Sequence, residues 1–195
     1  MDPKEGELAV KFAREVMEKW VSGRKKPEPP KLPKVFSEKR GVFTTLHTYP
    51  GHELRGCIGL PYPIKPLVDA IMDSAMSVTR DPRFPELGKD ELDKIIVEVS
   101  ILTKPEKIEA RNPGDYMKRV EIGKDGLIIK SGFNSGLLLP QVAAENGFDQ
   151  RQFLECLCWK AALPSDAWKS KETEIYKFQA EIFKEQKPRG KIVSK

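Results

Sequence analysis

The segment 95–102 constrains the fold more strongly than any other part of the chain, because it reads IIVEVSIL. Apolar, mostly β-branched residues alternate around Glu98 and Ser100, which is the period-two pattern of a β-strand with two different faces. Alternate residues of a later segment, 176–183, also share one face. Two further segments lie on either side of a Pro-Gly turn, and one more follows a Lys-Asp-Gly turn. The predicted strands are therefore 42–49, 54–60, 95–102, 126–130 and 176–183.

Helical periodicity appears in the segments between these strands. Apolar residues recur at i, i+3 and i+4 spacing in 6–22 and 64–75, and Gly147 separates two later helices at 140–146 and 150–163. The proline-rich stretch KKPEPPKLP after the first helix cannot be helical and predicts a stiff connector. Strands grouped around helices, with hairpin-type turns, predict an α+β fold with a largely antiparallel sheet.

The composition fits one globular domain or two small lobes, since the 195 residues are 39% hydrophobic and 32% charged. A chain of this length buries enough surface to need no disulfide, so its three cysteines are interpreted as cytosolic thiols. The sequence has neither a signal-peptide pattern nor about 18 consecutive apolar residues, so we expect no membrane span and a cytoplasmic location.

The positive charge is concentrated at one end of the sequence. The net charge is +5, and the segment 184–195 contains five basic residues against one acidic residue. We therefore expect a basic tail, which we place at 186–195. Nucleic-acid-binding proteins more often carry a basic stripe on folded structure, so nucleic acid is only a weak candidate partner.

Several common catalytic and cofactor motifs are missing from the sequence. There is no P-loop, no GxGxxG, no HExxH and no GxSxG. Two histidines and three cysteines are too scattered for a paired-ligand zinc site, and Cys156 and Cys158 point in different directions on a helix. We therefore predict neither a metal site nor a cofactor.

The most unusual feature is the sequence LRGCIG at 54–59. Glycines weaken a strand, so Gly56 and Gly59 mark either a bulge or a point where another group approaches the backbone. Cys57 lies between them, and Arg55 is on the same side if the strand is regular. A neighbouring cation favours the thiolate, as a nucleophile requires. The alternative is a buried thiol packed under the glycines, with Arg55 in an ion pair.

Four other residues are weaker candidates for a site. His47 lies on the strand that faces Cys57 and could act as its base, or it could be a structural residue. Glu98 faces either a cleft or the solvated side of the sheet. Asp81 and Arg83, in a proline-bounded loop, bind an anionic ligand in one interpretation and form a structural ion pair in the other.

These motifs resemble those of the AMMECR-type domain family. Besides LRGCIG, the similar segments are DPRFP at 81–85, VEVSIL at 97–102, GKDGL at 123–127 and GLLLPQVA at 136–143, in the expected order. The resemblance covers about residues 8–185 and makes the chain a single AMMECR-type domain of the archaeal type. Relatives often read Lys-Ala-Gly-Leu where this sequence has KAAL at 160–163, a departure at a glycine-dependent helix end.

The resemblance implies an α+β fold of two unequal lobes, with a cleft near LRGCIG. It supplies no activity, but it implies association with Memo-like and radical SAM proteins and therefore a role in a modification or small-molecule pathway. In the enzyme hypothesis, Cys57, Arg55 and Glu98 are catalytic, and the ligand-binding residues are Gly56, Gly59, Arg83 and His47. The alternative is a non-catalytic module that binds a partner protein or nucleic acid.

Overall fold

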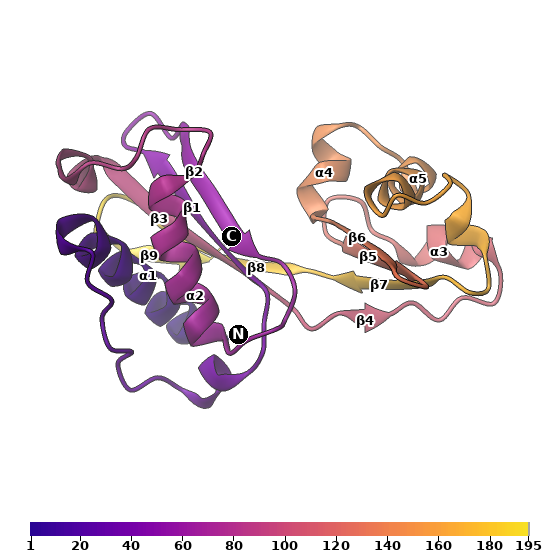
Figure 1. Cartoon of the computed structure of the whole chain (residues 1–195), viewed down its shortest axis with the longest axis horizontal. Helices are drawn as coiled ribbons and strands as arrows, with labels where there is room; N and C mark the ends of the chain where they lie inside the picture. Colours follow the sequence, from indigo (N-terminus) through magenta and orange to yellow (C-terminus); the bar gives the residue numbers. More distant parts are fainter. Residues whose placement is uncertain (195) are drawn as a thin grey trace. The chain divides into compact units, whose positions relative to one another are not determined.

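The chain folds into two units, and its C-terminal segment returns to the first of them (Figure 1). The computed structural model describes residues 1–194. The first unit contains residues 1–102 and the segment that begins at Glu181, and the second contains residues 103–180. Each unit combines helices with antiparallel strand pairs, which confirms the predicted α+β class.

A five-stranded sheet forms the centre of the first unit. Its strand order is β2-β1-β3-β8-β9, so β2 and β9 are the edge strands. The central part of the sheet is antiparallel, because β1 pairs with β2 on one side and with β3 on the other. The strands are β1 (Val42–Thr48), β2 (Leu54–Leu60), β3 (Ile95–Leu102), β8 (Ala180–Glu185) and β9 (Ile192–Ser194).

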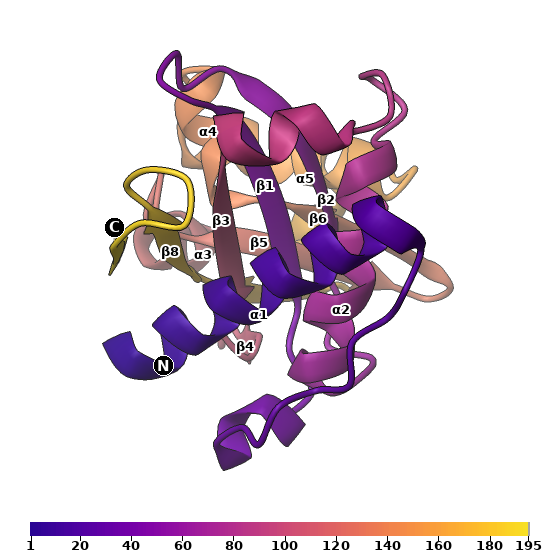
Figure 2. The ribbon, with the colours of Figure 1, turned by 90° about the vertical axis from the view of Figure 1, so that its left-hand side faces the viewer.

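Two helices, α1 (Pro3–Gly23) and α2 (Leu67–Ser77), cover one face of this sheet (Figure 2). Helix α1 begins with a capping box between Asp2 and Glu5, which satisfies N–H groups at the helix start. Its apolar stripe, which includes Phe12, is buried against the sheet. Within residues 1–194, no helix has the length and apolar character that crossing a membrane requires. Short 3₁₀ helices occupy Lys34–Ser37, Val78–Arg80 and Lys89–Lys94.

The opposite face of the sheet is more polar. Val97, Val99 and Ile101 belong to the core under the helices, so the residues between them in β3 point the other way. These are Glu98 and Ser100, and both are more than nine-tenths buried. The period-two pattern of the sequence therefore separates an apolar face from a polar one, and the polar face carries the predicted acidic residue.

The second unit has its own sheet and its own core. Its sheet has the order β4-β7-β5-β6, and residues of β5, β6 and β7 pack with helix α5 around the buried Trp168. The strands are β4 (Glu106–Lys107), β5 (Gly126–Ser131), β6 (Asn134–Leu138) and β7 (Glu174–Phe178). The helices are α3 (Pro113–Arg119), α4 (Pro140–Glu145) and α5 (Gln150–Lys160), followed by a 3₁₀ helix at Ala167–Lys169.

The single strand predicted at 176–183 is wrong. The structure divides it into β7 and β8, which belong to different sheets. The break lies at Gln179, whose backbone N–H donates to Thr103 Oγ1 and whose side chain donates to Asp125 Oδ1, both at 2.9 Å. Partners distant in sequence thus divide a segment whose local pattern is continuous. The segment that leads into α4 also contains β6, which the sequence pattern did not predict.

Folded structure extends further toward both ends than the predicted range of 8–185. Helix α1 begins at Pro3 because its capping box stabilises an earlier start. Strand β9 pairs with β8 in the segment expected to be a basic tail. Within that segment, Arg189 contacts Asp93 and its Nε donates to Glu18 Oε1 at 2.9 Å. Part of the tail's positive charge is therefore paired with acidic groups of the same unit.

The end of α5 places an alanine in a left-handed backbone conformation. Ala162 has a φ of 55°, a conformation that costs about 1–2 kcal/mol for residues with a Cβ. We expect Ala162→Gly to raise the free energy of unfolding by about 0.5–1 kcal/mol, because the greater flexibility of unfolded glycine offsets part of the gain. Urea unfolding measures the change. Ala161→Gly is the matched control and should destabilise, since Ala161 has an ordinary φ of −92°. A loss of stability in both variants would contradict the explanation.

Candidate functional site

A cluster of reactive side chains lies on the polar face of the first sheet. Cys57 on β2 is directly opposite Thr45 on β1, which is in turn opposite Glu98 on β3. The Thr45 hydroxyl donates to the Cys57 sulfur at 3.3 Å. The Glu98 Oε2 atom is 3.9 Å from His47 Nε2 and 4.0 Å from Lys184 Nζ on β8. We call these five residues the polar cluster.

The position of Glu98 is costly unless its charge is compensated. It occupies the middle of an otherwise largely apolar strand and is only 8% exposed, and burying an isolated carboxylate is strongly unfavourable. The side chains of His47 and Lys184 are also mostly buried, and the Lys184 ammonium supplies a compensating positive charge. Titratable side chains gathered in a mostly buried position are frequent at functional sites. Glu98 therefore does not lie on an open, solvated face.

The arrangement combines a nucleophile with acid–base groups. The hydroxyl of Thr45 donates a hydrogen bond to the Cys57 sulfur, which fixes the position of the thiol on this face. His47 is two residues from Thr45 on the same strand and lies diagonally across from Cys57 on the same face. A thiol, a carboxylate and an imidazole on one sheet face, with β1 between Cys57 and Glu98, are the kinds of group that nucleophilic catalysis uses.

The backbone of Cys57 is held by a second pair of residues, Asp81 and Arg83, which we call the edge latch. Because β2 is an edge strand, the Cys57 N–H and C=O have no neighbouring strand on the outer side. The N–H donates to Asp81 Oδ2 at 2.8 Å, and Arg83 Nη2 donates to the C=O at 3.1 Å. Two further hydrogen bonds, from Arg83 Nε and Nη2 at 3.0 and 2.7 Å, bind the guanidinium to Asp81. The latch thus takes the place of a further strand beside Cys57.

The edge latch is electrostatically strong. The Arg83 guanidinium holds the pKa of the Asp81 carboxyl well below its usual range, although burial of the carboxyl acts in the opposite direction. Asp81 in turn raises the pKa of Arg83. Asp81 is therefore ionised at neutral pH, where it accepts the N–H of Cys57 as a carboxylate.

Arg55 contacts Glu91 and not the Cys57 thiol. Its Nε and Nη2 donate to the two Glu91 oxygens at 2.7 and 3.0 Å, and Nη2 also donates to the carbonyl of Pro85. The pairing of β1 with β2 shifts at this point, so that Arg55 is an extra residue outside the regular alternation. The structure therefore has the ion pair of the alternative interpretation, and the guanidinium beside Cys57 belongs to Arg83.

The two glycines of LRGCIG allow close packing within the protein. A Cβ on Gly56 would lie 3.0 Å from the carbonyl oxygen of Val78, and a Cβ on Gly59 would lie 2.3 Å from that of Val42 and 2.4 Å from the ring of Phe43. The space above these glycines, which the enzyme hypothesis reserved for a substrate, is occupied by neighbouring residues. Their role in the structure is to let β2 approach the surrounding chain.

Some residues of the site were not found from the sequence. The candidates Cys57, His47 and Glu98 are brought together as members of the polar cluster. Thr45 was overlooked, although its spacing of two residues from His47 is a usable signal. Lys184 has no local signal, because only the pairing of β8 with β3 brings it to Glu98. Among residues 1–194, no group of three or more His, Cys, Asp or Glu side chains is arranged to hold a metal ion.

Comparisons with known proteins give a consistent family. A family model described as AMMECR1 matches residues 10–183. Protein MJ0810 of Methanocaldococcus jannaschii is 52% identical over 192 residues, which are 98% of this chain and 95% of the relative. Protein PH0010 of Pyrococcus horikoshii is 49% identical over 195 residues, covering 97% of this chain and 94% of the relative. A crystal structure of the uncharacterized protein PH0010 matches with a TM-score of 0.83 at 47% identity, covering 100% of this chain and 98% of that chain.

Proposed function

The chain belongs to the AMMECR1 family, as its motifs indicate, and we propose that it is an enzyme in which the Cys57 thiol attacks an electrophilic carbon of a small molecule. The observation that carries this proposal is the polar cluster, in which the sulfur accepts a hydrogen bond from Thr45 and shares its sheet face with Glu98. The relatives' names specify no reaction, so the proposal depends on the site itself.

The proposed step is a substitution at carbon. A bond forms between the Cys57 sulfur and the substrate carbon, and the bond to the leaving group breaks with its electron pair. The thiol proton passes to the carboxylate and imidazole pair of Glu98 and His47, which then protonates the leaving group. A second nucleophile, water or a co-substrate, later releases the product from sulfur.

A reactive thiol also suggests where the protein works. Cys57, Cys156 and Cys158 are all free, and free thiols are maintained in a reducing compartment such as the cytoplasm. We therefore propose a cytoplasmic enzyme or pathway component. Memo-like and radical SAM proteins are the first partners to test, by co-purification with the tagged chain, because their association is implied by the family.

The proposal is tested by the pH dependence of iodoacetamide modification at each cysteine of the native protein, followed by mass spectrometry. Cys57 should react faster than Cys156, a half-buried thiol on α5 that serves as the matched control. Thr45→Val should slow the reaction of Cys57 about fivefold, since one hydrogen bond contributes about 1 kcal/mol. Cys158 should stay unmodified, because it is buried and burial raises the pKa of its thiol.

The opposite result is equally clear. If Cys57 is modified only when the protein unfolds, the thiol is architectural and the enzyme proposal is wrong. Cys57→Ser identifies the modified peptide in either case. The remaining interpretation would then be a binding module, and the search would turn to partners captured by the intact chain.

A further inference from the structure

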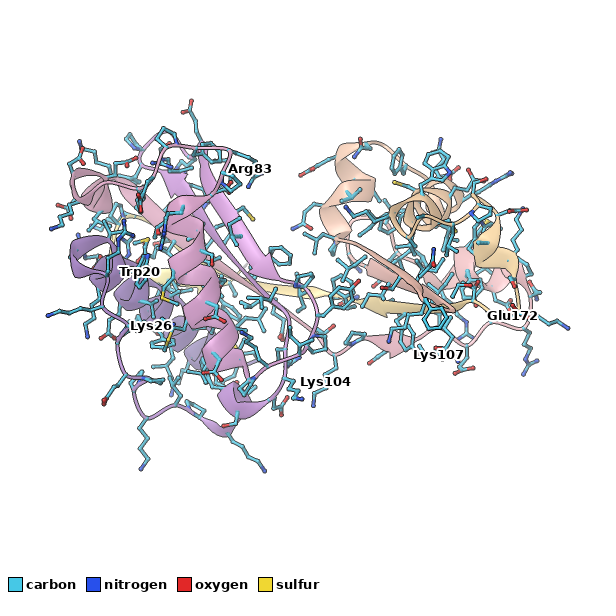
Figure 3. The ribbon with its side chains drawn as sticks, viewed as in Figure 1. Trp20, Lys26, Arg83, Lys104, Lys107 and Glu172 are labelled. Atoms are coloured by element: carbon cyan, nitrogen blue, oxygen red, sulfur yellow. The ribbon has the colours of Figure 1, made fainter. Side chains whose placement is uncertain are left out.

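We propose that Arg83 forms an anion-binding subsite beside Cys57, so that the substrate carries a carboxylate or phosphate group close to its electrophilic carbon. This inference rests on the proposed function, because it names the substrate class of the same site. Arg83 extends from the loop after the 3₁₀ helix Val78–Arg80 (Figure 3). The guanidinium is the only cationic group among residues 1–194 that donates a hydrogen bond to the backbone of Cys57.

Only one edge of the Arg83 guanidinium is used by the protein. Nε and Nη2 donate to Asp81, and Nη2 also donates to the carbonyl of Cys57. A guanidinium has five N–H donors, and the two on Nη1 make none of the hydrogen bonds found within residues 1–194. The side chain is 55% exposed. A charged donor pair therefore faces outward next to the proposed nucleophile.

The neighbouring Arg55 provides a comparison, because its ion pair with Glu91 is mostly buried. Its Nε and Nη2 donate to Glu91 and to the Pro85 carbonyl, much as those of Arg83 donate to Asp81 and Cys57, but its side chain is only 12% exposed. Arg55 and Arg83 both lie over the ring of Phe84, with guanidinium carbons 5.9 and 5.7 Å from its centroid. The two arginines therefore share surroundings and a similar hydrogen-bond pattern but differ in exposure, 12% for Arg55 and 55% for Arg83.

The edge latch also makes Arg83 a prepared binding group. Asp81 fixes the orientation of the guanidinium before any ligand arrives, so an incoming anion does not have to order a flexible side chain. Planar guanidinium donors match the two oxygens of a carboxylate or phosphate. Because Nη2 donates to the Cys57 carbonyl, an anion bound by Arg83 lies within a short distance of the residue that carries the thiol.

Two alkylating agents of similar size, one anionic and one neutral, test the subsite. Iodoacetate carries a carboxylate next to its reactive carbon, and iodoacetamide is its neutral counterpart. At Cys57 we compare the rate with iodoacetate to the rate with iodoacetamide. We expect this rate ratio to be more than about tenfold higher in the folded protein than at the same cysteine in the urea-unfolded chain. Arg83→Gln should return the ratio to that reference, and the matched variant Arg55→Gln should leave it high.

Inorganic phosphate provides a test that needs no variant. Added to the unmodified protein at constant ionic strength, it should slow alkylation of Cys57 by iodoacetamide and leave the rate at Cys156 unchanged. This measurement keeps the inference testable if Arg83→Gln does not fold, which thermal unfolding would reveal.

The outcomes separate the two proposals. A reactive Cys57 with the reference ratio and no protection by phosphate overturns the anion subsite and leaves the thiol enzyme in place. A Cys57 that reacts with neither reagent overturns the proposed function, and the subsite with it. A high ratio that persists in Arg83→Gln assigns the selectivity to another group and also refutes the role of Arg83.

Discussion

Replacing Glu185 with Gln should lower the free energy of unfolding by about 3–5 kcal/mol, because it removes the buried carboxylate that pairs with Arg14 and leaves Arg14 with Glu18, 3.4 Å from its Nη1, as a counter-ion. Arg14 is 6% exposed and Glu185 3% exposed. Arg14 Nε donates to Glu185 Oε1 at 3.1 Å, and its Nη2 donates to Oε2. The Oε2 atom also accepts the N–H of Val97 at 2.9 Å. One carboxylate thus joins helix α1 to strands β8 and β3.

A glutamine cannot reproduce this arrangement. It has one acceptor oxygen where Glu185 uses two, and its amide group would point N–H donors at the donors of Arg14 or Val97. Urea unfolding followed by circular dichroism measures the loss. Glu155→Gln, which breaks an exposed pair with Arg151 on α5, is the matched control and should cost less than about 1 kcal/mol. Equal losses in the two variants would show that burial does not amplify the interaction.

A variant without either charge, that of Arg14 or that of Glu185, shows whether the loss of stability comes from the missing contact or from the incompletely paired buried charge. Arg14→Met combined with Glu185→Leu should recover a large part of the stability lost in Glu185→Gln, because no unpaired ion remains in the core. If the double variant is less stable than the single one, the hydrogen bonds of Arg14 to the carbonyls of Leu92 and Ile95 matter more than its charge.

Local pattern was enough to predict the elements that carry the site. The bounds of β2 and β3 agree with the predicted segments 54–60 and 95–102, because both are short segments in which period two or flanking turns decide the structure. The same alternation put Glu98 on the face opposite Val97 and Val99. The helices agree for a similar reason, although the ends of α1 and α2 differ by a few residues.

Long-range pairing decides what the local pattern cannot. Arg55 and Arg83 are both plausible neighbours of Cys57 in the sequence, and the choice between them depends on Glu91, which lies 36 residues from Arg55. The register shift between β1 and β2 then removes Arg55 from the face of Cys57. No periodicity in 54–60 reveals either fact. Lys184 enters the polar cluster only through the strand order of the sheet.

Asp81→Asn should lower the free energy of unfolding by about 2–4 kcal/mol at neutral pH, because it weakens several charge-assisted hydrogen bonds at once. Asp81 is 2% exposed and accepts from the backbone N–H groups of Cys57 and Arg83 and from the Arg83 guanidinium. An asparagine has one oxygen for these donors, and its own amide donors would face them. The half-exposed guanidinium is partly screened by solvent, which keeps the effect below that of Glu185→Gln.

The pH dependence of this difference has a definite sign. The pKa of Asp81 is lowered in the folded state, chiefly by its hydrogen bond to Arg83, and is about 3.9 in an unfolded chain. The carboxylate therefore contributes its full stabilisation above the unfolded pKa, and this contribution is lost as the pH falls toward the folded pKa. The gap in stability between the wild type and Asp81→Asn should be constant from pH 7 to about pH 5 and should narrow below about pH 4. Urea unfolding across this range measures it.

Asp93→Asn is a matched control for the acid range, because Asp93 is an exposed aspartate that contacts Arg189. It should change stability little at any of these pH values. A gap for Asp81→Asn that keeps its full size at pH 3 would mean that the carboxylate charge is not what the fold uses, and that the geometry of the loop alone matters.

The same variant separates the charge of Arg83 from its orientation. Asp81→Asn leaves the guanidinium in place but loosens the fork that aims it, whereas Arg83→Gln removes the charge. If the anion preference at Cys57 depends on a fixed guanidinium, Asp81→Asn should lower the iodoacetate to iodoacetamide ratio partway to the unfolded reference. A ratio unchanged from the wild type would mean that positive charge near the sulfur is sufficient. The edge latch would then serve the stability of β2 and not the selection of an anionic substrate.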